Sequence, residues 1–262
     1  MKTPKMVLIT NDDGIDSPGL HALAAGALEA GLNVTIAAPV TEASGSSASI
    51  TAWEDEGRIR VEQRTLEGLE SVPAFAVHGT PGFISMIATH GAFGDRPDLV
   101  LSGVNRGANV GRVILHSGTV GAALTAGVNG GHGMAVSLDT GLNPERLHWN
   151  TAALLATGLL PYLMDQRVGT VLNLNVPNVD GSELPEFRTA TLAEFGIVQT
   201  TVAERGEEHL RLAIADSQES APPESDFALL AAGFATVTGI QPVTESHLPD
   251  FSAVADRRRS SK

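Results

Sequence analysis

Short apolar runs alternate with helix-like segments through the first two-thirds of the chain, and this alternation constrains the fold most. The runs that read as buried strands are Met6–Thr10, Asn33–Pro39, Asp98–Gly103, "MAVSL" (134–138) and "TVLNLNVP" (170–177). Strands joined through helices pair in parallel, because a parallel connection needs a long crossover. The pattern therefore predicts an α/β fold with a doubly wound, mostly parallel, Rossmann-like sheet.

Helix signals separate these runs. Ser17-Pro18 places a capping residue before a proline, and the helix that follows is predicted to reach Ala30 and stop at Gly31. Other helices are predicted to begin at Thr80-Pro81, to span Ser117–Gly131, and to run from about His148 to Asp165. Ligands of such sheets bind at the carboxyl ends of the strands, so the loops before these helices are the expected location of the site.

The pattern changes in the last third of the chain. Residues 1–176 are predicted to form the Rossmann-like core, and residues 177–250 a β-rich extension with a short helix. Within it, "FRTATLAEF" (187–195) and "EHLRLAIAD" (208–216) are predicted to be antiparallel strands. We expect the extension to serve oligomerisation or site closure, and the charged tail 251–262 to be disordered.

Composition excludes several classes of function. The net charge is 17 − 30 = −13, which disfavours a nucleic-acid binder because such proteins need a basic face. The chain has no cysteine, so a thiol nucleophile, a disulfide and a cysteine-ligated metal are excluded. No apolar stretch approaches the ~18–20 residues of a membrane span, and no signal peptide is recognised. We therefore expect a cytoplasmic protein with no membrane partner.

Two adjacent carboxylates follow the first apolar run, in "TNDDG" (10–14). Asp12 and Asp13 repel each other, so in a partly buried loop they stay ionised only beside a compensating cation. Mg²⁺ or Mn²⁺ fits best, because these ions prefer hard oxygen ligands and keep several waters. The alternative interpretation is a solvated turn built on Asp13-Gly14.

The stretch "SGVNRGANVGRVILHSGTV" (102–120) is the most informative in the chain. Glycines and asparagines recur along it: Gly103, Asn105, Gly107, Asn109 and Gly111. Glycine lets a backbone approach an anion closely, and asparagine offers both a carbonyl ligand and an amide donor. Ser117, Gly118 and Thr119 then begin a helix, where free amides and the helix dipole favour a phosphate. The alternative is a tight loop with an ordinary serine cap.

Two other loops carry weaker signals. In "VTEASGSSAS" (40–49), Ser44 could supply a neutral hydroxyl ligand, although serine-glycine loops are also common linkers. In "HGTPG" (78–82), a catalytic role for His78 is less favoured than a structural one, and Thr80 is predicted to be a helix N-cap.

Taken together and in order, these motifs resemble the SurE family of stationary-phase survival proteins. The resemblance rests on "NDDG-DSPG", "AP---ASGSS-SIT", "HGTP", "SG-N-G-N-G----SGTV-AA" and "LN-NVP", and it extends to the late "SDFALLAAGFATVTGIQP". It implies that Asp12, Asp13, Ser44 and Asn105 hold one divalent metal ion, Mg²⁺ or Mn²⁺. Asn109, Ser117, Gly118 and Thr119 would then bind the substrate phosphate, with Asp12, Asp13, Asn109 and Ser117 as the catalytic group.

The resemblance also implies a reaction and its partners. Proteins of this family are metal-dependent 5′(3′)-nucleotidases, so the expected substrate is a nucleoside monophosphate, with short polyphosphate a further possibility. A metal-activated water would attack phosphorus in line, and the expected assembly is a homodimer or homotetramer. Two alternatives stay open: an aspartyl-phosphate phosphatase with Asp12 as nucleophile, and a non-catalytic nucleotide-binding regulator.

Two departures from the family pattern bear on substrate preference. His116 stands where the family usually has tyrosine, and Gly82 with Phe83 replaces polar residues in "TPGFI". Both positions are expected to flank the pocket.

Overall fold

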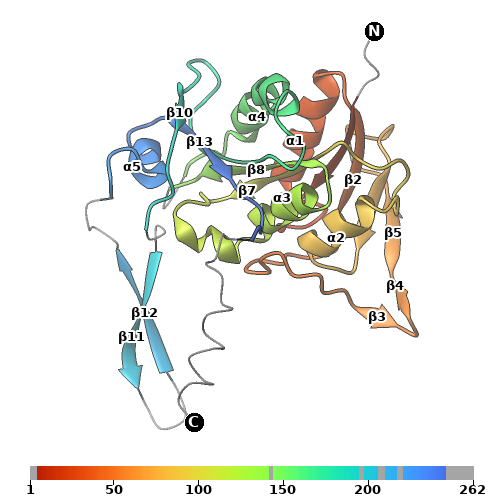
Figure 1. Cartoon of the computed structure of the whole chain (residues 1–262), viewed down its shortest axis with the longest axis horizontal. Helices are drawn as coiled ribbons and strands as arrows, with labels where there is room; N and C mark the ends of the chain where they lie inside the picture. The colour runs from red at the N-terminus through yellow and green to blue at the C-terminus, as the bar shows by residue number, and fades with distance from the viewer. Residues whose placement is uncertain (1–4, 142–143, 195–197, 206–209, 217–220, 246–262) are drawn as a thin grey trace, which may run out of the picture.

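A nine-stranded sheet with helices on both faces forms the body of the computed structural model (Figure 1). The structure describes residues 5–141, 144–194, 198–205, 210–216 and 221–245. In spatial order the strands are β10 (Phe187–Thr189), β13 (Ala235–Ile240), β9 (Val171–Pro177), β8 (His132–Asp139), β7 (Leu99–Arg106), β1 (Met6–Thr10), β2 (Asn33–Pro39), β6 (Ala74–Val77) and β5 (Val61–Arg64). The predicted α/β class and mostly parallel sheet are confirmed.

The order of the strands reverses between β1 and β7. The strands from β9 to β6 all run parallel. From β1 the chain moves outward to β2 and β6, whereas from β7 it moves the other way through β8 to β9. Thr10 of β1 lies opposite Ser102 of β7 at this reversal. Doubly wound sheets bind ligands in the crevice outside such a point.

Four of the described helices pack on the central strands of the sheet and cover both of its faces (Figure 1). The four are α1 (Pro18–Glu29) and α4 (Trp149–Met164) on one face, and α2 (Pro81–Ala88) and α3 (Gly118–Val128) on the other. Ile9 packs with the α1 and α4 cluster, and its neighbour Leu8 packs with α2. Successive strand residues point to opposite faces, so both become buried, at about 1.5–3 kcal/mol for each large side chain.

The start of α1 follows the sequence prediction. Ser17 is the N-cap, and its Oγ accepts a hydrogen bond from the backbone N–H of Leu20 at 3.3 Å. Pro18 occupies the first turn, and Ala30 caps the other end before Gly31 at φ 80°. This helix therefore begins directly after the Asp12-Asp13 turn.

Strand β7 is longer than the predicted Asp98–Gly103. It continues to Arg106, with a register shift against β8 between Ser102 and Asn105. Gly103 sits at φ 138°, and a side chain there would begin 2.2 Å from the carbonyl oxygen of Val136. Only glycine fits this approach of the two backbones, and the extra length carries Asn105 to the carboxyl edge of the sheet.

The region after residue 177 divides between two sheets. The prediction of an antiparallel strand is wrong for "FRTATLAEF", because its strand β10 pairs in parallel with β13. The second segment instead forms β12 (Leu210–Asp216), which pairs with β11 (Val198–Arg205) in a separate antiparallel sheet. β13 is antiparallel to β9 and offers β10 an open edge. The helix of this region is α5 (Asp226–Ala231), and the tail 251–262 lies outside the described residues.

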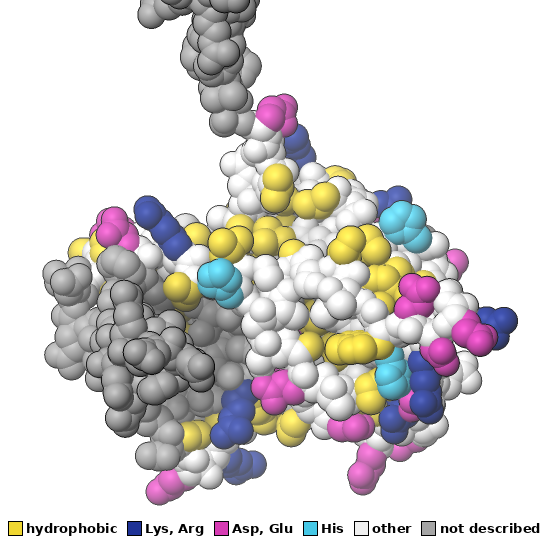
Figure 2. Space-filling view, turned by 90° about the horizontal axis from the view of Figure 1, so that it is seen from below, with side chains coloured by type: hydrophobic (Ala, Val, Ile, Leu, Met, Phe, Trp, Pro, Cys, Tyr) yellow, Lys and Arg dark blue, Asp and Glu magenta, His cyan; other side chains and the backbone are white. Residues whose placement is uncertain are grey.

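Short strands and charged side chains lie at the end of the molecule beyond β6, where the sheet ends at β5 (Figure 1). At that end lie β3 (Glu54–Asp55) and β4 (Arg58–Ile59), whereas the remaining short element, the 3₁₀ helix η1 (Arg112–His116), lies between β7 and α3. Figure 2 shows acidic and basic side chains interleaved at the end where β3 to β5 lie, and Glu62 there contacts both Arg60 and Arg64 at 3.1 Å. Among the helices that the structure describes, none has the length and apolar character needed to cross a membrane.

Candidate functional site

The two adjacent carboxylates lie in the turn that follows β1. Asp12 is buried, at 5% relative exposure, and Asp13 is half-buried. The side chain of Asn11 fixes the turn, because its Nδ2 donates to the Gly14 carbonyl at 3.0 Å and its Oδ1 accepts from the Gly14 N–H at 3.2 Å. The same Nδ2 donates to Ser17 Oγ at 2.6 Å. The turn is therefore held to the start of α1, and the solvated-turn interpretation does not fit Asp12.

Burial makes both charges costly. Desolvation raises the pKa of Asp12, although the hydroxyl of Thr119 and the backbone amides of Thr119 and Gly118 oppose the rise. Desolvation, followed by repulsion from Asp12, raises the pKa of Asp13 to about 6. The Arg106 backbone N–H, 3.3 Å from Asp13 Oδ2, offsets part of this. A cation beside the pair would favour its ionised form.

The start of α3 faces Asp12. Thr119 donates its hydroxyl to Asp12 Oδ1 at 2.5 Å. A side chain at Gly118 would begin 2.8 Å from Asp12 Oδ2 and 2.5 Å from Ser46 Oγ. Ser117 caps the helix, since its Oγ accepts from the Val120 N–H at 3.1 Å. The predicted Ser-Gly-Thr segment thus meets the first aspartate directly, and its threonine hydroxyl holds a carboxylate.

The serine-glycine loop after β2 completes this side of the site. The Ala43 N–H donates to the Asp12 carbonyl at 2.7 Å, which places Ser44 one residue from the aspartate turn. The Ser44 hydroxyl donates to Glu42 at 2.5 Å. Ser46 was not predicted: its Oγ is buried and finds no hydrogen-bond partner among the described residues. The Ser46 hydroxyl therefore lies beside Gly118, on the side where Gly118 faces the Asp12 carboxylate.

The glycine-asparagine loop between β7 and η1 lies at the same edge of the sheet. Asn105 is half-buried, and its Nδ2 donates to the Gly107 carbonyl at 2.7 Å. Its neighbour Arg106 contacts Asp13 through the backbone. Gly107 and Gly111 have φ values of 111° and 67°, which L side chains rarely adopt. The loop therefore needs its glycines.

A polar platform under Asn109 was missed in the sequence. Asn175 Oδ1 accepts from the Asn109 N–H at 2.7 Å, and Asn173 and Asn175 both donate to its carbonyl, at 2.8 and 2.9 Å. Ser137 Oγ accepts from Asn109 Nδ2 at 2.9 Å. A visible signal existed: two asparagines at alternate positions of an apolar strand share one face.

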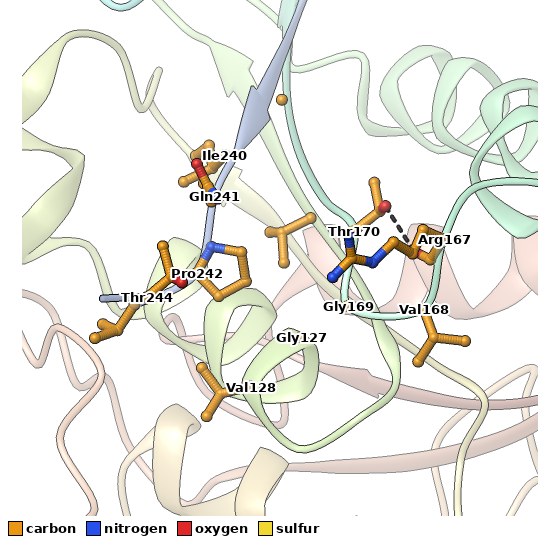
Figure 3. A pocket seen from close by; sticks show the side chains of 13 residues that line it. Gly127, Val128, Arg167, Val168, Gly169, Thr170, Ile240, Gln241, Pro242 and Thr244 are labelled. Atoms are coloured by element: carbon orange, nitrogen blue, oxygen red, sulfur yellow. Dashed lines mark hydrogen bonds between the residues drawn. The ribbon is translucent and has the colours of Figure 1, made fainter. Parts of the chain in front are cut away.

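A cavity of about 580 Å³ lies elsewhere, at the opposite end of the sheet (Figure 3). Its lining includes Val128 at the end of α3 and Val171 at the start of β9. The helix has 11 residues, so at 1.5 Å per residue this end lies about 16 Å from the end that faces Asp12. Among the described residues, the lining of this cavity contains no aspartate or glutamate. The cavity is therefore separate from the polar and acidic residues that surround Asp12.

Comparisons with known proteins place the chain in a family. The model of the family described as "Survival protein SurE" matches residues 7–198. The 5′/3′-nucleotidase SurE of Edwardsiella ictaluri is 34% identical over 246 residues, 92% of this chain and 91% of that protein. The 5′-nucleotidase SurE of Symbiobacterium thermophilum is 35% identical over 241 residues, 90% and 91% of the two chains. The chain belongs to the SurE family.

A solved SurE structure has the same fold. The crystal structure of the SurE protein from Aquifex aeolicus covers 98% of this chain and all of its own, with a TM-score of 0.71 at 24% identity. The family model and the two relatives confirm the recognition of SurE from the motifs, and the solved structure confirms the fold that it implied.

The two departures from the SurE pattern have different places in the structure. Phe83 is buried in the core cluster of α2, so the expectation that it flanks the pocket is wrong. Gly82 is required by packing, because a side chain there would begin 2.8 Å from the carbonyl oxygen of Ser49. His116 is exposed directly before Ser117, and its carbonyl accepts from the Ser47 N–H at 3.2 Å.

The "HGTP" motif of this SurE chain serves the fold. His78 contacts Glu62 at 3.1 Å. Thr80 stands at the N-cap of α2 as predicted, but its hydroxyl makes no cap and donates to the carbonyls of Ser49 and Thr51. The motif therefore holds the far end of the serine loop.

The donor set of this SurE chain fits a hard divalent ion. Among the described residues, no three His, Cys, Asp or Glu side chains lie close enough together to bind a metal. The set is instead two carboxylates with raised pKa values and neutral oxygens around them. Mg²⁺ suits such a set, because it binds through one or two carboxylates and keeps waters.

Proposed function

We propose that this chain hydrolyses nucleoside 5′-monophosphates to nucleosides and inorganic phosphate with one divalent metal ion, Mg²⁺ or Mn²⁺. The SurE relatives named as 5′-nucleotidases support the reaction. The observation that carries it here is the contact between Asp12 and the start of α3. That contact joins a costly pair of carboxylates to a helix end suited to phosphate.

The proposed metal ligands are Asp12, Asp13, Ser44 and Asn105. Two carboxylates supply charge, and a hydroxyl and an amide carbonyl supply neutral oxygens. When bound, the ion would neutralise phosphate charge and lower the pKa of a water.

The proposed phosphate site is Asn109 with Ser117, Gly118 and Thr119. The platform of β9 asparagines holds the Asn109 backbone, and the Ser117–Thr119 backbone lies at the positive end of α3. These groups would stabilise charge that develops on the phosphoryl oxygens. Water oxygen bonds to phosphorus as the ester P–O bond breaks. Asp12 is the carboxylate available to accept a proton of the water, and the 5′-oxygen takes up a proton as it leaves, so that the products are the nucleoside and inorganic phosphate.

A turnover assay tests the proposal. Purified protein with Mn²⁺ is expected to release phosphate from a nucleoside 5′-monophosphate, and chelation with EDTA is expected to abolish release until Mn²⁺ is restored. The absence of turnover with either ion would leave nucleotide binding alone, as a non-catalytic regulator predicts. A phospho-enzyme trapped on Asp12 would favour the aspartyl-phosphate alternative instead.

A substrate panel and a sizing experiment extend the test. The name of the Edwardsiella relative motivates a 3′-monophosphate in the panel, and the SurE resemblance motivates short polyphosphate. A homodimer or homotetramer is proposed from the same resemblance, and light scattering measures it. A cytoplasmic location stays a prediction from the sequence, which cell fractionation tests.

A further inference from the structure

Asp226 is a buried carboxylate far from the catalytic groups in sequence. It is the first residue of α5 and has 0% relative exposure. Its Oδ2 accepts from the Gly111 backbone N–H at 2.8 Å, and its Oδ1 accepts from the N–H groups of Ala193 and Phe227, both at 2.9 Å. Only the Phe227 contact lies within its own helix.

The contact with Gly111 reaches into the glycine-asparagine loop. Gly111 ends that loop and begins η1, at φ 67°. The next residue, Arg112, donates its N–H to the Ala193 carbonyl at 2.9 Å. Asp226 and the segment at Ala193 therefore both hold the downstream end of the loop, and Asp226 does so from 115 residues away in the chain.

The loop has two other anchors, and both come from the sheet. The Gly107 N–H donates to the Leu138 carbonyl of β8 at 2.9 Å, and Asn173 and Asn175 of β9 hold the Asn109 backbone. Asn109 thus lies between one anchor upstream and the Asp226 anchor two residues downstream. A buried carboxylate that accepts several backbone N–H groups forms strong, charge-assisted bonds.

We propose that Asp226 is a positioning residue that holds the loop so that Asn109 meets the substrate phosphate. This inference rests on the proposed function, because positioning Asn109 matters only if Asn109 binds the substrate phosphate. It gives the last third of the chain a direct part in the site.

The test compares Asp226→Ala with Asp226→Asn and with Ser225→Ala. Ser225 is the N-cap of α5 and accepts from the Ala228 N–H at 3.3 Å, so its loss weakens the same helix without touching Gly111. Steady-state kinetics are measured with Mn²⁺ and a nucleoside 5′-monophosphate below the unfolding transition of each variant. Amide hydrogen exchange is measured over residues 107–116 in parallel.

Asp226→Ala is expected to lower kcat/KM about 100-fold, because displacement of a positioning group by ~1 Å costs about this factor. Its KM should rise, which a loss of folded molecules alone does not produce. Asp226→Asn keeps one acceptor oxygen and should recover part of the activity. Exchange at the Gly111 amide should accelerate in Asp226→Ala and stay unchanged in Ser225→Ala.

Wild-type KM, kcat/KM and Gly111 protection in Asp226→Ala would overturn the proposal, and so would the same losses in Ser225→Ala. A wild-type protein that turns over no nucleotide would reject the proposed function separately. The exchange comparison would still decide whether Asp226 holds the loop.

Discussion

The two ends of one parallel sheet differ in this protein. At the carboxyl end, the buried Asp12 and the half-buried Asp13 lie side by side, and the pKa values of both are raised. At the amino end lies a cavity of about 580 Å³, and the charged pair Lys5–Asp98, which precedes β1 and β7 at that end, is half-exposed, at 3.9 Å. The carboxyl end thus contains two carboxylates whose burial is unfavourable, whereas the amino end contains a cavity.

This difference teaches where to look for chemistry. A cavity requires only imperfect packing, but burying two like charges costs several kcal/mol unless something compensates. Folds retain such costs mainly where a ligand, a metal or catalysis offsets them. Uncompensated charge is therefore the better guide to the site here than cavity volume, and variants at the two ends of the sheet test that conclusion.

The largest effect is expected from Asp12→Asn. The change keeps the size of the side chain but removes one of the two charges, so we expect metal-dependent phosphate release to fall about 10³-fold, as for loss of a principal charge stabiliser. Thermal unfolding of the metal-free variant should occur at or above the wild-type temperature, because a costly buried charge is gone. Full activity in this variant would contradict the metal-centred account.

A matched pair of glycine substitutions compares the two ends directly. Gly118→Ala would place a methyl group 2.8 Å from Asp12 Oδ2 and 2.9 Å from its Cβ, so Asp12 must move, and activity should fall about 100-fold. Gly239→Ala, in the lining of the amino-end cavity, meets no heavy atom within 4 Å. Its activity should equal that of the wild type. Equal losses in the two variants would erase the contrast between the ends.

The smallest effect concerns stability at the amino end. His132, the first residue of β8, is buried, and its Nδ1 finds no partner among the described residues. Burial, and then the charge of Lys5, lower its pKa. The unfolded chain therefore binds a proton near pH 6.5 more readily than the folded protein, so stability is lost as pH falls through this range.

His132→Gln is expected to reduce that loss. Urea unfolding at pH 7 and pH 5 measures it, and the difference in free energy between the two pH values should be smaller in the variant than in the wild type. Phosphate release at pH 7 should not change. An unaltered pH dependence of stability would show that the pKa of His132 is the same in the folded and the unfolded state, which would contradict the account.

Local chemistry could be predicted from the sequence, whereas contacts between distant segments could not. The Asp12-Asp13 pair and the Ser117 cap depend on neighbours in the chain, so their residue types reveal them. The contact of Asp226 with Gly111 depends on tertiary packing across 115 residues.

Strand pairing shows the same limit. "FRTATLAEF" has strand character, but its partner is decided by the free edge of β13. Phe83 was misplaced for a similar reason, since the sequence does not reveal which face of a short helix the core will cover.

Anomalous diffraction from a crystal soaked in Mn²⁺ tests the central claim most directly. The account predicts one strong anomalous peak per chain between the carboxylates of Asp12 and Asp13, beside the start of α3. The same soak of Asp12→Asn crystals should show that peak weakened or lost. An active wild-type crystal with no manganese at the two aspartates would contradict the claim that their burial is compensated by a cation.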